Sequence, residues 1–552
     1  MRVPGIAYAV VAAALSLRAV AQVPLPSPAD PARIEERISP QRPTERTPEL
    51  PRLRGAPPPR ESEELRAIRF TLKEVNIEGA TAIPAERLQA HVQRYVGREV
   101  TGSNVFAMAH QLTAYYRAEG YILSQVIVPP QSFSDGRLTL RVIEGYIANV
   151  RVEGDATLAA QLAELGERIK ASRPLRGNVL ERYLLLANDL AGVQLRSVLS
   201  PSQTVGAADL TLIASVRRVE GFASLDNYGS KYLGPGQLSV GLAGNHLIGV
   251  GDQLRFVGVG TGSDEMRYGQ LAYNRVVSAE GLKLGGTFSR TLTRPGDALE
   301  PFDVRGRADM YTLSAAYPLW RTANGSVLTR AVFDHRDIDT DILGTRAIED
   351  RIRALRLGAT WLSLDRLEGR NALDVEFSQG LGGTAVDDPL KSRAGADGKF
   401  TKVVFDFERF QSLGSRFGVT LGAGGQWTNE PLLSSEQFAL GGRRFGRAYE
   451  PAELVGDRAL AARVEPAYLG LVGRPWLSSY QLYGFWDGGK VWSDNGPSAS
   501  LASAGFGSRA ALGRNVSASL EAAWPLTRPV ASYVASGHGD RVRILGSMVV
   551  RF

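Results

Sequence analysis

The chain has 552 residues, of which 22% are charged, and a formal net charge of +7. It contains no cysteine, which excludes a disulfide framework and a thiolate metal site, and its mean hydropathy of -0.12 excludes a bundle of membrane helices. The Lys and Arg residues are scattered and form no basic helical block. We therefore expect them to line a lumen and to meet lipid headgroups, and we expect no nucleic acid partner.

The first 21 residues are predicted to be a cleaved secretory signal peptide. Arg2 precedes an apolar run over about residues 6–17, which is too short to span a bilayer as a helix. Ala19-Val20-Ala21 follows this run, so we expect cleavage after Ala21.

Residues 22–68 are predicted to be a Pro-rich linker, because they are too polar and too rich in proline to pack a core. A short helix is expected at 30–38, where Asp30 can cap the first turn and Pro31 suits the first helical position. A transient turn of helix in a disordered arm is the alternative that the sequence leaves open.

Two compact units are predicted after the linker, at 69–145 and 146–218. Each has the order strand, helix, helix, strand, strand, so the pair forms an internal repeat of about 75 residues. In the first unit the expected elements are a strand at 70–77, helices at 84–95 and 103–118, and strands at 122–128 and 138–143. In the second they are a strand at 148–152, helices at 156–171 and 178–190, and strands at 194–201 and 209–217.

Residues 219–552 are predicted to form an antiparallel membrane β-barrel of sixteen strands. Leu373, Val375 and Phe377 alternate with Asp374 and Glu376, as expected when one face of a strand meets lipid and the other a polar lumen. Connections are short and long by turns, as an outer-membrane barrel requires. The short ones lie at 249–252, 323–325, 367–369, 414–415, 473–475 and 513–515, and long polar loops lie at 295–306, 380–398 and 429–457.

Several motifs of the two units resemble those of a known family. The segments Tyr115-Tyr116, Gly120-Tyr121, Val128-Pro129 and Val142-Ile143-Glu144-Gly145 make the first unit resemble a polypeptide-transport-associated (POTRA) domain. It is similar to the first POTRA domain of the two-partner secretion pores (the TpsB family), which includes the exporters of filamentous haemagglutinin and haemolysin. The second unit resembles their second POTRA domain, and Asp226–Ser230 resembles their entry into the first barrel strand.

The long loop at 429–457 carries a motif that resembles the inward-folded sixth loop of this family. Gly441-Gly442 is followed by Gly446-Arg447-Ala448-Tyr449, where the family has Val-Arg-Gly-Tyr/Phe at the tip. Gly446 therefore stands for Val, and Ala448 stands for the second Gly, although Ala resists a positive φ.

A second motif, Phe485-Trp486-Asp487-Gly488-Gly489, fits the family's Phe-x-Asp-x-Gly strand. If Trp486 faces lipid, strand parity alone directs Asp487 into the lumen. The resemblance implies that Asp487 pairs with Arg447 and holds the loop inside the barrel, a pairing that suits the planar guanidinium. The alternative is a lumen aspartate and a loop arginine that never meet. Gly456-Asp457 and an inward Glu465 resemble the family's pattern with weaker specificity.

Candidate catalytic and metal-ligating groups fail on spacing. Asp337, Asp339 and Asp341 lack the glycine that a calcium loop needs, so we interpret them as solvated charges of an external loop. Ser536, His538 and Asp540 are crowded into one loop and would struggle to reach triad geometry. The five histidines show no metal-ligand spacing, so we expect neither an enzyme nor a cofactor.

Taken with the resemblance, these features predict an outer-membrane pore with periplasmic POTRA domains that exports a large, unfolded partner exoprotein. An assembly factor that inserts other outer-membrane proteins is the alternative. Phe552 ends the last strand on its lipid-facing row, and this aromatic end resembles the signal that the barrel-assembly machinery reads. The resemblance also implies that the helix at 30–38 plugs the resting barrel.

Overall fold

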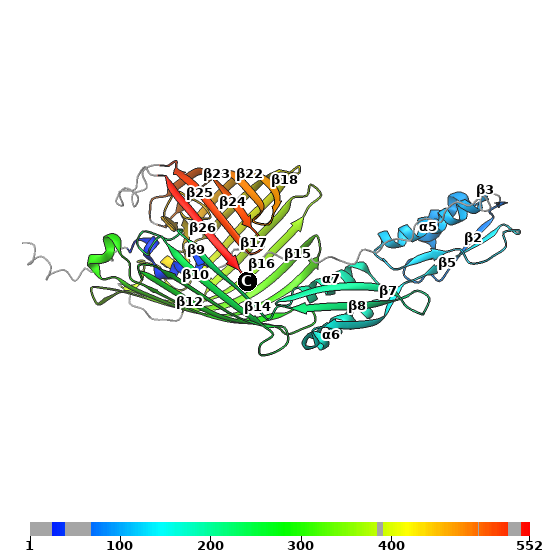
Figure 1. The fold of residues 1–552 in the computed structure, drawn as a ribbon, viewed down its shortest axis with the longest axis horizontal. Coiled ribbons are helices and arrows are strands. Elements are labelled where there is room, and N and C mark those ends of the chain that lie inside the picture. Colours follow the sequence, from blue (N-terminus) through cyan, green and yellow to red (C-terminus); the bar gives the residue numbers. More distant parts are fainter. Residues whose placement is uncertain (1–24, 39–67, 383–389, 495, 528–541) are drawn as a thin grey trace, which may run out of the picture.

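The computed structural model describes residues 25–38, 68–382, 390–494, 496–527 and 542–552. The expected signal peptide with Ala21, the linker at 39–67 and the loop with Ser536, His538 and Asp540 lie outside the described residues. Two small α/β units follow one another along the long axis beside a barrel (Figure 1).

The first unit packs two helices on a three-stranded sheet around its own buried core. The expected strand at 70–77 is wrong, because the chain changes partners within it: Leu72 N donates to Arg98 O and Lys73 N donates to Gly136 O. Two short strands result, one paired with β3 and the other with β5. The elements are β1 (Arg69–Thr71), β2 (Glu74–Glu78), α4 (Ala85–Val92), β3 (Glu99–Thr101), α5 (Gly102–Ala118), β4 (Gln125–Ile127) and β5 (Arg137–Ile143).

The second unit repeats the strand pairing of the first. In each unit the first long strand runs parallel to the last strand, which also pairs antiparallel with the strand between them. The sheet orders are therefore equivalent, β2-β5-β4 and β6-β8-β7. The elements are β6 (Tyr146–Gly154), α6 (Ala159–Lys170), α7 (Gly177–Asn188), β7 (Val193–Pro201) and β8 (Ala207–Val216).

Polar contacts fix the second unit to the near end of the barrel. Asp189, just after α7, receives two bonds of 2.8 and 2.9 Å from the guanidinium of Arg321. Tyr183 on α7 donates to Glu280 at 2.8 Å. Because Arg321 is only 5% exposed, its pairing with Asp189 compensates a largely desolvated charge.

Sixteen antiparallel strands close the barrel, as the alternating pattern predicts. No helix among the described residues is long and apolar enough to cross a membrane. The first and last strands meet through five residue pairs, from Ser547 opposite Asp226 to Arg551 opposite Phe222. The strands are β9 (Val219–Asp226), β10 (Gln237–Asn245), β11 (Asp252–Thr261), β12 (Met266–Val276), β13 (Lys283–Thr293), β14 (Arg305–Thr322), β15 (Gly325–Ile342), β16 (Thr345–Leu364), β17 (Arg370–Gly380), β18 (Thr401–Leu413), β19 (Phe417–Thr428), β22 (Arg458–Arg474), β23 (Leu477–Trp492), β24 (Ala499–Leu512), β25 (Val516–Pro525) and β26 (Arg543–Arg551).

The prediction that Asp337, Asp339 and Asp341 are solvated charges of an external loop is wrong. Asp337, Asp339 and Asp341 lie within β15, because the β15–β16 hairpin continues as a paired ladder as far as Ile342 and Thr345. Arginines of β16 neutralise them: Arg351 lies 3.2 Å from Asp337, and Arg346 lies 2.6 Å from both Asp339 and Asp341.

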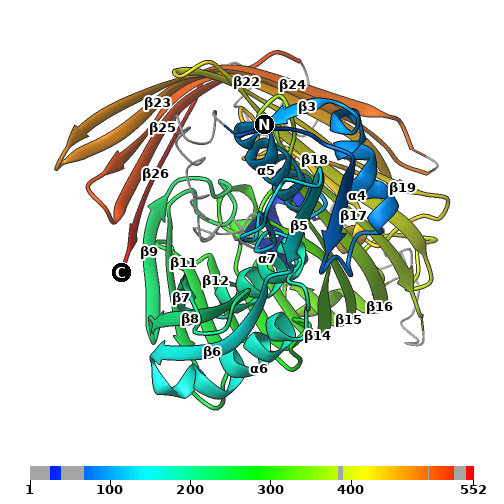
Figure 2. The same cartoon turned by 90° about the vertical axis from the view of Figure 1, so that its right-hand side faces the viewer.

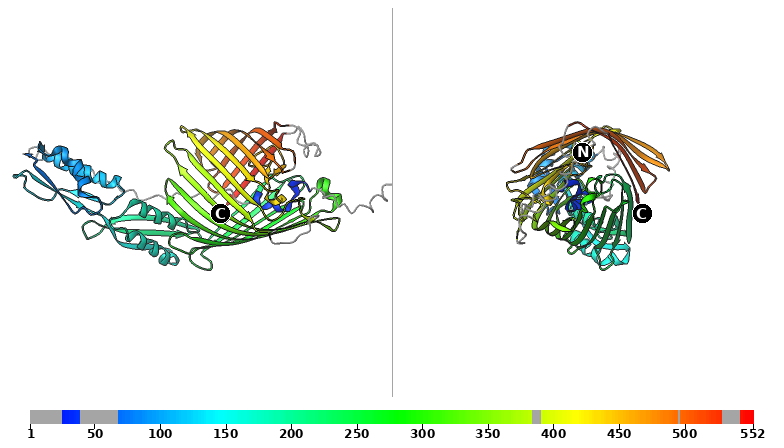
Figure 3. Two further views of the ribbon diagram at one scale, coloured as in Figure 1. Left: turned by 180° about the vertical axis from the view of Figure 1, so that it is seen from behind. Right: turned by 90° about the vertical axis from the view of Figure 1, so that its left-hand side faces the viewer.

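The described part of the N-terminal arm, residues 25–38, lies inside the barrel, as the dark blue segment of Figures 1 to 3 shows. Its short turns are η1 (Ser27–Ala29), η2 (Pro31–Arg33) and α2 (Ile34–Ile38). Asp30 caps η2 by accepting from Ala32 N at 2.9 Å. The first part of the expected helix is thus a 3-10 turn.

Candidate functional site in the barrel lumen

The loop at 429–457, which joins β19 to β22, folds back into the lumen. A small hairpin of β20 (Phe438–Leu440) and β21 (Leu454–Gly456) leads to and from its tip. At the tip Phe445, Ala448 and Tyr449 pack into an apolar cluster with Tyr483 and Phe485 of the barrel wall. The tip is therefore held by burial as well as by polar bonds.

Glycines at 441, 442 and 446 let the loop turn back on itself. All three have a positive φ, from 86° to 108°. A Cβ at Gly441 would lie 2.2 Å from the carbonyl oxygen of Glu450, so only glycine fits there. Ala448 has no positive φ, so its replacement of the family's second glycine strains nothing.

The guanidinium of Arg447 lies among three carboxylates of the barrel wall. Its Nε lies 3.0 Å from Asp487 Oδ2, its Nη2 lies 2.8 Å from Glu465, and its Nη1 lies 2.9 Å from Glu521. It also lies 4.0 Å above the ring of Phe485. With Arg447 3% exposed and Asp487 fully buried, these are contacts in a largely dry part of the lumen.

Asp487 also fixes the backbone of the tip. Its Oδ1 accepts from Gly446 N at 2.8 Å and from Ser503 Oγ, while Trp486 beside it is 44% exposed on the outer face. The parity expected for β23 is therefore present. Gly489, one further inward position, leaves room for the neighbouring strand and for the loop, because a Cβ there would lie 2.8 Å from the carbonyl oxygen of Leu460 and 3.0 Å from the side chain of Leu440.

The remaining sequence-predicted positions divide into those at the tip and those far from it. Glu465 links Arg447 to Arg509, whose Nη1 lies 2.6 Å from it. Tyr449 donates to the carbonyl oxygen of Thr527 at 2.7 Å. Phe552 lies outside the lumen, is 63% exposed, and exchanges two backbone hydrogen bonds with Gly221 of β9.

Glu521 is a member of the cluster that the motifs do not indicate. It lies on the inward row of β25 with Ser517 and Ser519. An acidic residue in a row of small polar residues is the sequence feature that could have indicated it. Tyr483 donates to Glu521 at 2.8 Å, which satisfies a second lone pair of the carboxylate.

The arm occupies another part of the same lumen. Ile34 is 1% exposed and packs with Leu233, Val257 and Tyr268 of the wall and its first loop. Glu35 accepts from Ser289 Oγ at 2.6 Å. Arg33 is buried and donates to Gln437 O at 3.2 Å.

Within the described ranges, no group of three or more His, Cys, Asp or Glu residues is arranged to hold a metal ion. Ion pairs and hydrogen bonds hold two segments, the arm and the inward loop, inside the lumen. Such an arrangement can hold and release chain segments.

Comparisons with known proteins agree with this architecture. Residues 70–145 match the POTRA domain of ShlB type, and residues 210–510 match the family of haemolysin secretion/activation proteins ShlB/FhaC/HecB. The outer membrane transporter CdiB of Escherichia coli is 26% identical over 478 residues, which cover 83% of this chain and 79% of that protein. The heme/hemopexin transporter protein HuxB of Haemophilus influenzae is 24% identical over 419 residues, which cover 73% of this chain and 71% of HuxB.

A solved structure of CdiB from Escherichia coli has the same fold. It superimposes with a TM-score of 0.72 at 22% identity, covering 90% of this chain and 94% of CdiB. The fold class and the family resemblance inferred from the sequence are thereby confirmed. The chain belongs to the haemolysin secretion/activation family of two-partner secretion transporters, which lie in the bacterial outer membrane with their POTRA units in the periplasm.

Proposed function

We propose that this pore exports one large, unfolded partner protein, and that the arm and the inward loop close the lumen between transport events. The observation that carries the proposal is that both segments lie in the same lumen and are held there by ion pairs and hydrogen bonds. These ion pairs and hydrogen bonds can be exchanged for contacts with the partner protein during its export. The proposed function needs no catalytic step.

The POTRA sheets offer the means of capture. Their orders leave β2 and β4 at the edges of one sheet and β6 and β7 at the edges of the other. An extended segment of the partner would add to such an edge through backbone hydrogen bonds, which tolerate many sequences. On β7 the side chain of Val198 is 47% exposed and would supply an apolar contact for the added strand.

We propose that the ion pair of Arg447 and Asp487 holds the loop tip in the lumen, and that Glu465 and Glu521 are further partners of Arg447. Gly441, Gly442 and Gly446 give the tip its path, and Tyr449, Phe485 and Gly489 give it a wall to pack on. We propose that outer-membrane lipid and the barrel-assembly machinery are the other partners, the latter through Phe552.

Two experiments test export and plugging. Co-expression with a large secreted protein from the neighbouring reading frame should release that protein into the medium, and deletion of the pore should abolish release. A general loss of outer-membrane proteins on deletion would instead support an assembly factor.

Deleting residues 22–38 should raise single-channel conductance in a planar bilayer with secretion largely retained, and unchanged conductance would refute the plug.

A further inference from the structure

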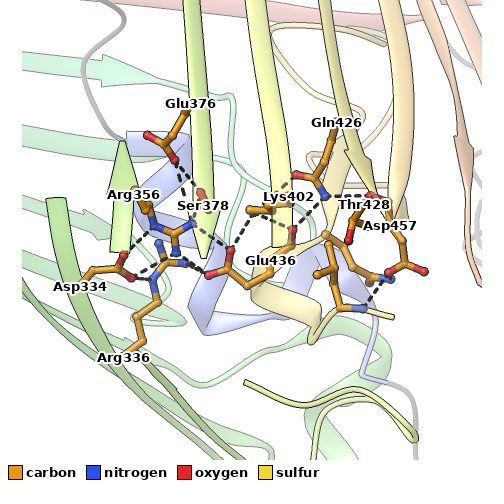
Figure 4. A network of polar contacts seen from close by, with 12 residues as sticks. Asp334, Arg336, Arg356, Glu376, Ser378, Lys402, Gln426, Thr428, Glu436 and Asp457 are labelled. Carbon is orange, nitrogen blue, oxygen red and sulfur yellow. Dashed lines mark hydrogen bonds and ion pairs between the residues drawn. The ribbon is translucent and has the colours of Figure 1, made fainter. Parts of the chain in front are cut away.

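A second group of buried charges fastens the base of the inward loop, away from Arg447. Its centre is Glu436, at the end of η7 (Ser434–Glu436), with a side chain that is 1% exposed. Arg356 of β16 and Lys402 of β18 each lie 2.7 Å from its carboxylate, and Arg336 of β15 lies 3.4 Å away (Figure 4).

Three cations of this group share two close carboxylates, Asp334 and Glu436. Asp334 accepts from Arg356 at 2.6 and 3.2 Å and from Arg336 at 2.9 Å, so it serves two of the three cations. Without Glu436, three largely buried cations would share that one nearby carboxylate, apart from Glu376 at 4.0 Å from Arg356. Unpaired buried charge is strongly unfavourable, so the turn at Glu436 is held in place.

The backbone of this turn is fixed as well. The carbonyl oxygen of Glu436 accepts from Lys402 Nζ at 2.9 Å and from Gln426 Nε2 at 3.0 Å (Figure 4). Side chain and carbonyl together hold Glu436 to β16, β18 and β19.

The arm binds to the residues on either side of Glu436. Arg33, which is 2% exposed, donates to the carbonyl oxygens of Ser434 and Gln437. Asp30 accepts from Ser434 Oγ at 2.6 Å. The polar bonds from Asp30 and Arg33 to the loop therefore converge on the one turn that Glu436 immobilises.

We propose that Glu436 is the positioning residue of the plug. Its ion pairs with Arg356 and Lys402 fix the turn at 434–437, and Arg33 and Asp30 bind to this turn and so hold the arm in the lumen. This inference rests on the proposed function. Because one turn carries both the ion pairs and the acceptors for Arg33, release of the arm and release of the loop base are coupled.

The test measures arm occupancy in the full-length protein in outer membranes. Ala32 on the arm and Ala308 on β14 line the same small cavity, and the chain has no native cysteine, so Ala32→Cys with Ala308→Cys forms a clean pair for dibromobimane. Neither alanine belongs to the Glu436 group. The variant is Glu436→Gln, and the matched control is Glu408→Gln, which removes another lumen carboxylate paired with an arginine, Arg463.

We expect Glu436→Gln to lower the cross-linked fraction at least about threefold and to raise open-channel conductance toward that of the arm-deleted protein, because it removes one of the two carboxylates that lie close to three cations. Glu408→Gln should change neither measurement. If Glu436→Gln loses the folded barrel on a heat-modifiability gel, Lys402→Met replaces it as the test. This variant keeps the pair of Glu436 with Arg356, so the cross-linked fraction should fall less than in Glu436→Gln but in the same direction.

Cross-linking that is unchanged from the parent in a folded variant overturns the proposal, as does an equal fall in Glu408→Gln. If arm deletion itself leaves conductance unchanged, the plug role fails. The cross-linked fraction then still judges whether Glu436 positions the arm, so the two failures are distinguishable.

Discussion

Replacing Arg447 by alanine should release the loop tip more completely than replacing Asp487. Arg447→Ala leaves three carboxylates without their shared partner, whereas Asp487→Ala leaves the guanidinium bound to Glu465 and Glu521 and removes the acceptor of the hydrogen bond from Gly446 N. Breaking a buried pair costs about 3–5 kcal/mol, and one hydrogen bond to a charged group contributes about 1.5–3 kcal/mol. We expect the docked loop to lose free energy near the first range in Arg447→Ala and near the second in Asp487→Ala.

The loop position can be read in whole cells by protease. Arg443 and Arg444 lie in the tip, so trypsin added outside should cut a released loop and spare a docked one. A loss of about 3 kcal/mol raises the released population more than a hundredfold, since about 1.4 kcal/mol is a factor of ten. Arg463→Ala is the control, because it removes a lumen arginine that pairs with Glu408 of the wall and not with the loop.

Secretion should fall in the same order, while the heat-modifiable barrel remains. The loss in the double variant should be smaller than the sum of the two single losses, because each single variant already breaks the Arg447–Asp487 pair. The reasoning is refuted if the two single variants are equally cleaved, or if the losses in the double variant add.

Three further predictions concern other parts of the chain. Deleting Phe552 should reduce barrel in the outer membrane and increase periplasmic degradation, which immunoblots of the two fractions would measure. Burial alone would raise the pKa of Glu144, but hydrogen bonds from Thr81, Ala82 and Tyr116 outweigh it and hold that pKa below the ordinary 4.5. The first POTRA unit should therefore lose unfolding free energy as the pH falls below about 4.5, and urea unfolding of a 69–145 fragment should show a weaker dependence in Glu144→Gln. Asp189→Ala removes the carboxylate that accepts two hydrogen bonds from Arg321 and links α7 to the barrel, so amide exchange in α7 should quicken relative to Glu167→Ala, which alters an exposed pair on α6.

The features predicted well from the sequence are those that depend on local pattern. Period-two alternation and turn residues identify the barrel strands, and parity directs Trp486 outward and Asp487 inward without knowledge of any neighbour. Helix α5 likewise depends on residues close to it in the sequence. Thr101 and Asn104 cap its start reciprocally, and Gly120 follows its end.

What the sequence could not predict depends on closure of the barrel and on the path of the loop. Glu521 lies 74 residues from Arg447, and its inward row says nothing about which other inward residues it meets. The interruption at Leu72 depends on two different partner strands, neither of which is local. For Arg33, helical spacing alone could not show that backbone carbonyls of a distant loop, instead of charges, would be its acceptors.

The two ends of the inward loop carry opposite charges, and each end meets wall residues of the complementary sign. At its base the loop presents an anion, Glu436, to a wall region with the cations Arg336, Arg356 and Lys402. At its tip it presents a cation, Arg447, to a wall region with the carboxylates of β22, β23 and β25. A reversed or slipped loop would place like charges together in a poorly hydrated space, which is costly. We propose that each end can be released separately during export, because a passing chain can offer a carboxylate or an amine in exchange at one end while the other end stays bound.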